Sequence, residues 1–111
     1  MILEKENLEA AIGQYQEVIR RAPQSYLAYF HLGLIYAQKL LSTQAEWYFK
    51  KTIQIKPDFT PAYYNLCIFY LSLPKPDYEQ ASQYFNQAKN LGYKVDPEIE
   101  KIIQERKIPD K

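Results

Sequence analysis

The sequence has very few of the residues that carry most catalytic and metal chemistry. Its 111 residues include one His and one Cys, His31 and Cys67. A single Cys excludes an internal disulfide and a thiolate metal cluster, and it leaves the redox compartment undetermined. A nucleophile needs a base within hydrogen-bond reach, and no pattern here supplies such a pair. We therefore expect a non-enzyme with no catalytic residue, no metal site and no cofactor.

Long apolar runs and an excess of one charge are also missing. No stretch approaches the ~20 apolar residues of a membrane-spanning helix. Residues 1–3 are apolar, but the charged residues 4–6 follow at once, which is not a signal-peptide pattern. With 14 basic and 13 acidic residues, the chain has no strong field for nucleic acid or anionic lipid. These features predict a soluble chain, favour the cytoplasm, and argue against a membrane span and a nucleic-acid partner.

What the sequence does contain is one pattern of large, small and helix-breaking residues, centred on residues 26–57. Apolar residues three and four apart share one face of a helix, and small residues let two backbones approach closely. A proline ends the unit, because it cannot donate the next helical hydrogen bond. The pattern predicts two helices packed face to face. Its residues are Tyr29, Leu32, Gly33 and Tyr36, then Ala45 and Phe49, then Pro57.

The same pattern recurs on both sides with a period of 34 residues. Moving back by 34 carries Ala45 to Ala11 and Phe49 to Tyr15. Moving forward carries each residue of the first helix to a similar one, and the second helix then follows two residues late. The extra residues fall in 73–76, where a loop is expected. The forward counterparts are Tyr63, Leu66, Cys67 and Tyr70, followed by Ala81 and Phe85.

A 34-residue period with this order resembles the tetratricopeptide repeat (TPR) family. The resemblance implies an all-α fold of antiparallel helical hairpins that stack into a right-handed solenoid. It implies one domain of about two and a half repeats: a half repeat over 1–23, full repeats over 24–57 and 58–93, and a capping helix over 96–107. Tyr29 and Tyr63 stand where the family most often has Trp, and Cys67 replaces its second small Gly.

The resemblance also implies a function, which is non-catalytic protein–protein binding by an adaptor or scaffold. In the family, a stripe along the first helices lines a concave groove for a partner's peptide. Some members clamp an acidic C-terminus there with Lys and Asn, but Phe30 and Leu34 stand at two of those positions. We therefore expect an apolar or amphipathic partner segment. The stripe comprises Leu27, Phe30, Leu34, Tyr64, Asn65, Ile68 and Leu71.

Two other functions stay open. The chain could be a regulatory or assembly segment of a larger protein, including an enzyme whose catalytic part lies elsewhere. A helical-repeat RNA binder has repeats of similar length, but it needs a basic groove. The apolar stripe and the net charge of +1 disfavour that reading.

The first predicted helix, capped by Asn7 and ending near Arg21, has more apolar surface than one neighbour covers. We expect Ala11, Tyr15 and Val18 to pack on the next repeat. Three further apolar residues would then face the place of a missing first helix. Either upstream chain or a second copy of the chain, in a homodimer, could cover them. These predicted self-association residues are Leu8, Ile12 and Ile19.

Overall fold

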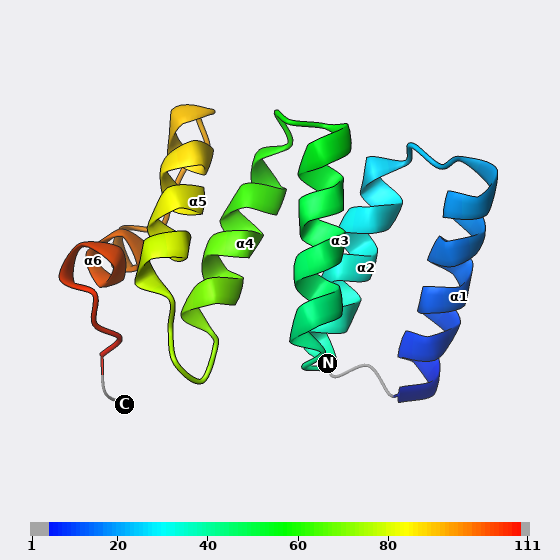
Figure 1. Cartoon of the computed structure of the whole chain (residues 1–111), viewed down its shortest axis with the longest axis horizontal. Helices are drawn as coiled ribbons and strands as arrows, with labels where there is room; N and C mark the ends of the chain where they lie inside the picture. Colours follow the sequence, from blue (N-terminus) through cyan, green and yellow to red (C-terminus); the bar gives the residue numbers. More distant parts are fainter. Residues whose placement is uncertain (1–4, 110–111) are drawn as a thin grey trace. The chain divides into compact units, whose positions relative to one another are not determined.

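A computed structural model describes residues 5–109, and this part of the chain is all-α (Figure 1). The six helices are α1 Lys5–Arg21, α2 Tyr26–Gln38, α3 Ser42–Ile55, α4 Thr60–Leu71, α5 Tyr78–Asn90 and α6 Pro97–Glu105.

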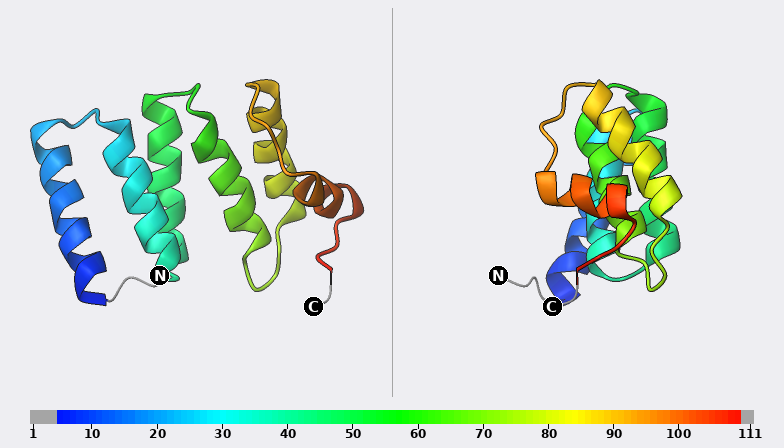
Figure 2. Two further views of the ribbon diagram at one scale, coloured as in Figure 1. Left: turned by 180° about the vertical axis from the view of Figure 1, so that it is seen from behind. Right: turned by 90° about the vertical axis from the view of Figure 1, so that its left-hand side faces the viewer.

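The helices divide into two compact units, Met1–Pro57 and Asp58–Lys111. In the first unit, α2 packs against α1 and more extensively against α3. In the second unit, α5 packs extensively against α4 and lightly against α6. The packed partners within each unit can be followed from two sides in Figure 2. All these pairs are neighbours along the chain, which is consistent with the predicted helical hairpins α2–α3 and α4–α5.

Side chains cap two of the helices. The backbone N–H of Gln80 donates to Asp77 Oδ1 at 3.0 Å at the start of α5. The N–H of Glu98 donates to Asp96 Oδ1 at 2.8 Å before α6. These bonds satisfy backbone donors that have no partner within the helix. The predicted Asn7 cap is wrong, because α1 begins at Lys5 and places Asn7 inside the helix.

The α2–α3 hairpin is closed by contact between a glycine and an aromatic ring. Phe49 of α3 is fully buried against Gly33 of α2. A Cβ added at Gly33 would lie 2.6 Å from Phe49 Cδ1, which is well inside van der Waals contact. Gly33 is therefore required here because a side chain would occupy the space of the ring.

A group of three tyrosine rings also joins α2 to α3. The rings of Tyr36 and Tyr48 stack with centroids 5.3 Å apart and planes inclined by 2°. Tyr29 approaches Tyr48 at 6.2 Å. Burial is the main cause that raises the pKa of Tyr48, and the two neighbouring tyrosines add to it. The rings thus join α2 to α3 through offset aromatic packing, which stabilises beyond the area buried.

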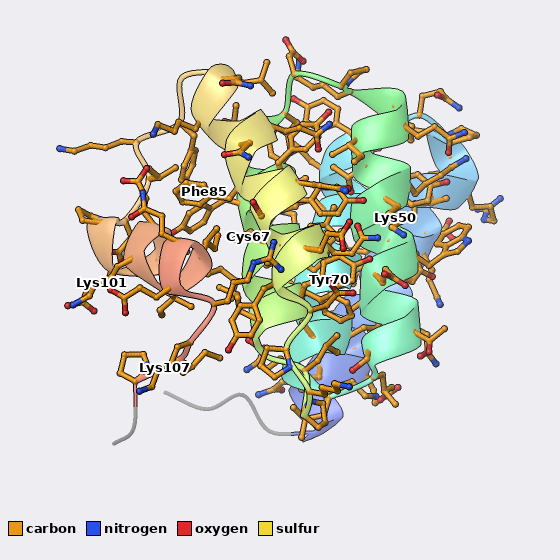
Figure 3. The ribbon with its side chains drawn as sticks, turned by 60° about the vertical axis from the view of Figure 1, so that its left-hand side comes forward. Lys50, Cys67, Tyr70, Phe85, Lys101 and Lys107 are labelled. Atoms are coloured by element: carbon orange, nitrogen blue, oxygen red, sulfur yellow. The ribbon has the colours of Figure 1, made fainter. Side chains whose placement is uncertain are left out.

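The α4–α5 hairpin repeats this arrangement with different residues. Cys67 replaces Gly33, Phe85 replaces Phe49, and both are buried in the hairpin (Figure 3). The rings of Tyr70 and Tyr84 stack with centroids 5.8 Å apart and planes inclined by 4°. Tyr63 lies 6.4 Å from Tyr84. These pairs correspond to the α2–α3 pairs with offsets of 34 residues on the first helix and 36 on the second.

The predicted division of α1 into two faces is wrong. Leu8 and Ile12 are buried in one cluster with Leu32 and Ile35 of α2. Ala11 and Tyr15 pack against this cluster as well, and so does Ile19. Val18, which was expected to pack on the next repeat, is 41% exposed. The homodimer interface inferred from Leu8, Ile12 and Ile19 was wrong in its residues.

The loop after α2 contains a leucine in an unusual backbone conformation. Leu40 has φ +62°, and its side chain is 86% exposed. Its N–H donates to Ala37 O at 3.0 Å, and the next N–H, of Leu41, donates to Tyr36 O at 2.9 Å. This is the Schellman ending, in which glycine is usual because left-handed backbone strains other residues. After α5 the same position is Gly92, with φ +92°.

We predict that Leu40→Gly raises the free energy of unfolding by about 1 kcal/mol. The left-handed conformation costs a non-glycine residue ~1–2 kcal/mol. Glycine relieves that strain but loses ~0.5–1 kcal/mol of chain entropy on folding. Because the Leu40 side chain is exposed, little packing is lost. Urea denaturation followed by circular dichroism measures the change. The reciprocal Gly92→Leu should destabilise, and a stabilising result there would contradict the argument.

Candidate binding surface on the first helices of the hairpins

In the first unit, the predicted stripe lies on α2 and is partly accessible. Leu27 is 46% exposed, and Phe30 and Leu34 are half-buried. The Phe30 ring lies 6.0 Å from the Phe49 ring and 5.9 Å from the His31 ring, measured between centroids. Phe30 is therefore held in place by its neighbours, while Leu27 leaves nearly half of its surface open to solvent.

In the second unit, two stripe residues on α4 already make contacts within the unit. The Tyr64 ring stacks on Tyr93, with centroids 4.8 Å apart. Burial raises the pKa of Tyr64, and a hydrogen bond to the Asp96 backbone opposes this shift. Asn65 Nδ2 donates to Pro61 O at 2.8 Å, within its own helix.

The two remaining α4 residues of the stripe differ in access. Ile68 is half-buried, whereas Leu71 is only 7% exposed. Leu71 is thus a core residue of this unit, and its predicted place on an accessible surface is wrong. Within each unit the accessible stripe narrows to Leu27, Phe30 and Leu34 on α2 and to Tyr64, Asn65 and Ile68 on α4.

The residues with reactive side chains are engaged in packing. The His31 ring stacks on Tyr15 of α1, with centroids 5.0 Å apart. Cys67 is fully buried, and burial raises the pKa of its thiol to about 12. Since the thiolate is the nucleophilic form, this thiol is poorly reactive at neutral pH. Over residues 5–109 no group of three or more His, Cys, Asp and Glu side chains is placed to hold a metal ion.

The outer face of α3 carries an aromatic and charged patch. Trp47 is largely exposed, and its ring meets the Tyr48 ring edge-on at 5.0 Å. Lys50 pairs with Glu46 at 3.5 Å, and Lys51 Nζ lies 5.9 Å from the centre of the Tyr29 ring. The charges of Lys50 and Glu46 cancel, and Lys51 leaves the patch with one formal positive charge.

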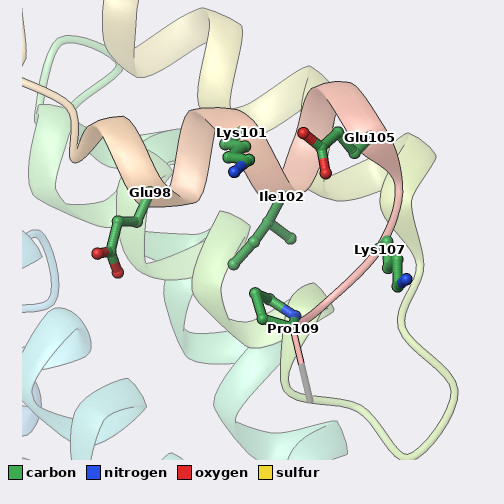
Figure 4. A pocket seen from close by; sticks show the side chains of 6 residues that line it. All are labelled: Glu98, Lys101, Ile102, Glu105, Lys107 and Pro109. Atoms are coloured by element: carbon green, nitrogen blue, oxygen red, sulfur yellow. The ribbon is translucent and has the colours of Figure 1, made fainter. Parts of the chain in front are cut away.

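A shallow hollow lies beside α6 (Figure 4). Two lysines and two glutamates line it, so its formal charges balance. Ile102 and Pro109 supply its apolar part. The helix is tied to α5 by the ion pair of Lys89 Nζ with Glu100 Oε2 at 2.8 Å, and none of its residues is fully buried. The hollow is open and carries no convergent polar groups that would select a small molecule.

Comparison with known proteins adds no relative. No family model matches the chain, and no curated protein resembles it significantly. Within the part of the chain that the structure describes, no helix is long and apolar enough to cross a membrane. The structure alone shows an all-α protein whose six described helices pack as sequential pairs.

Proposed function

We propose that the chain is a non-catalytic protein–protein interaction module, acting as an adaptor or scaffold. Its binding surface is the stripe on the first helices of the hairpins, and its ligand is an apolar or amphipathic segment of another protein. The observation that carries the proposal is Leu27, a large aliphatic side chain that is 46% exposed beside an immobilised Phe30. Aromatic side chains such as Phe30 are enriched in protein–protein interfaces, and Leu27 would add accessible apolar area beside it.

We further propose that the hairpins are TPR repeats, in a right-handed solenoid of about two and a half repeats with α6 as its capping helix. The support is the stacked tyrosine pair, which occurs in α2–α3 and again in α4–α5. In both hairpins a small residue and a Phe are also buried at equivalent positions. A polar outer helix is what the end of a repeat array requires, and α6 carries charged residues along most of its length.

A pair of matched variants tests the proposed surface. Leu27 and Leu91 are 46% and 45% exposed, so replacing either with Asp removes a similar, small amount of packing. The new charge is favourable in the first turn of α2 and slightly unfavourable at the end of α5. The full chain and both variants are used to select peptides from a displayed random library. We expect the wild-type chain to enrich apolar residues at helical spacing. Leu27→Asp should lose this enrichment, and Leu91→Asp should keep it.

Equal enrichment by all three proteins would place the binding surface elsewhere. Failure of the wild-type chain to enrich any sequence would count against peptide binding itself. Circular dichroism melting curves establish that both variants remain folded.

A further inference from the structure

The stripe of the second unit is partly covered by the chain that follows α5. The ring of Tyr93 stacks on the ring of Tyr64, with centroids 4.8 Å apart and planes inclined by 29°. Three residues further on, the backbone of Asp96 forms a hydrogen bond with the Tyr64 hydroxyl. One short segment therefore contacts the same stripe residue twice, and Tyr64 is half-buried.

The aromatic part of this cover is an addition to the repeat at the second hairpin. The residue 36 positions before Tyr93 is Pro57, which has no aromatic ring. The first-unit equivalent of Tyr64 is Phe30, whose ring packs near those of Phe49 and His31. These two neighbours belong to the α2–α3 hairpin itself, whereas Tyr93 lies beyond the end of α5.

The covering segment leads directly into α6, the most weakly held helix of its unit. Helix α6 packs only lightly on α5, whereas α4 and α5 pack extensively. It runs across α5 rather than alongside it, so the two helices meet over few residues (Figure 2). None of its residues is fully buried. The ion pair of Lys89 with Glu100, which ties it to α5, is exposed, and exposed pairs contribute little.

Weak packing of this kind allows α6 to detach by itself. Elements with few buried apolar contacts open locally at a lower free energy than the packed core around them. The α4–α5 hairpin therefore stays folded when α6 leaves. Detachment withdraws Asp96 from Tyr64 and frees the chain after Tyr93, so that the Tyr93 ring can turn away. Tyr64 then joins Ile68, four residues along the same helical face, as accessible surface.

We propose that residues 93–105 form a strap, which masks the stripe of the second unit and competes with the partner segment for Tyr64. This inference rests on the proposed function, because the strap regulates that same surface. A partner that needs Tyr64 binds only the open form, so its apparent affinity falls with the fraction of molecules that are open. A strap that is closed in about nine-tenths of the molecules lowers the affinity about tenfold.

A matched pair of substitutions on α6 opens the strap or leaves it closed. Ile103 is half-buried and Gln104 is exposed, and both lie in the last turn of the helix. Replacing either with Asp adds the same charge at the same end of the helix. Only Ile103→Asp places that charge on a half-buried apolar face, which disfavours the closed form. We expect Ile103→Asp to open the strap and Gln104→Asp to leave it closed.

Hydrogen–deuterium exchange followed by mass spectrometry measures the opening in the full chain. In the wild-type chain, the amides of α6 should exchange faster than those of α4 and α5. Ile103→Asp should speed exchange in α6 at least about tenfold over Gln104→Asp, without speeding exchange in α4. Exchange of α6 in step with α4 and α5 would overturn the proposal, because the strap would then open only when the whole unit unfolds.

Peptide selection tests whether opening exposes a binding surface. The wild-type chain and both variants select from the same displayed random library, and fluorescence anisotropy measures the affinity of the selected peptides. We expect Ile103→Asp to bind its peptides at least about tenfold more tightly than the wild type and Gln104→Asp do. Adding Tyr64→Ala to Ile103→Asp should remove this gain, because Tyr64 is the residue that the strap uncovers. Circular dichroism establishes that each variant remains folded.

The outcomes separate the strap from the proposed function. Equal affinity of all three proteins for the selected peptides would leave peptide binding standing and would overturn the strap. A gain that survives Tyr64→Ala would also overturn it, because the new surface would then lie elsewhere. If neither the wild type nor Ile103→Asp enriches any peptide, the strap and the proposed function both fail.

Discussion

Gly33→Leu is expected to lower the free energy of unfolding by about 3 kcal/mol, at the upper end of typical overpacking effects. Even a single Cβ at this position would lie 2.6 and 2.7 Å from two carbons of the Phe49 ring. A leucine adds three further carbons, and the fully buried ring has no empty space to enter. A domain has only ~5–15 kcal/mol of stability, so the loss should appear as a large fall in the urea midpoint.

Gly13 provides a matched control for that substitution. It also lies within a helix, but nothing comes within 4 Å of a Cβ added there. Gly13→Leu should therefore stabilise by ~0.5–1 kcal/mol, because leucine is a better helix former than glycine. Equal, small shifts in the urea midpoint for both variants would contradict the proposed Gly33–Phe49 contact.

Phe49→Ala is expected to cost ~3–5 kcal/mol, as is usual when a buried Phe is truncated. The more informative measurement combines it with Gly33→Leu. In the double variant the leucine occupies part of the space that the ring has left, so the combined loss should be smaller than the sum by at least about 1 kcal/mol. Chemical denaturation of the two single variants and the double variant measures this coupling. Phe49→Ala combined with Gly13→Leu should be additive within ~0.5 kcal/mol, and a similar coupling there would show that the effect is not specific to the contact.

The hairpins could be predicted from sequence because their contacts use residue types with few alternatives. A glycine flanked by Leu32 and Tyr36 inside an apolar helix has to be a point of close approach. The same spacing around Cys67 then places the second hairpin. The sequence predicts one helix over about 26–39 and another over about 78–90, and α2 and α5 agree with these bounds to within one residue.

The two faces expected on α1 are in fact one. Leu8, Ile12, Tyr15 and Ile19 are spaced by four, three and four residues, so they lie along a single side of the helix. In the structure Leu8 and Ile12 belong to the core cluster with α2, and Tyr15 and Ile19 pack against it. Dividing these residues between two neighbours therefore went against the helical spacing itself.

Two details of the structure, one in the stripe and one in a loop, depend on information that is not local in the sequence. Leu71 has the spacing of an accessible stripe residue, but the structure buries it. Leu40 lies at the end of α2, in the left-handed position where glycine is usual. No residue pattern therefore indicates its φ of +62°. In both cases the surrounding structure overrides the preference of the residue itself.

Within each unit, the packing of helices on their neighbours in the chain has a consequence for how fast the protein folds. The packed helices of each pair are separated by a short connection. Closing a short loop costs little chain entropy, and topologies with low contact order fold in microseconds to milliseconds. The α2–α3 hairpin can therefore form as soon as residue 55 has left the ribosome. Synthesis adds only ~5–20 residues per second, so the hairpin has time to bury its aromatic rings before the whole of α4 has emerged.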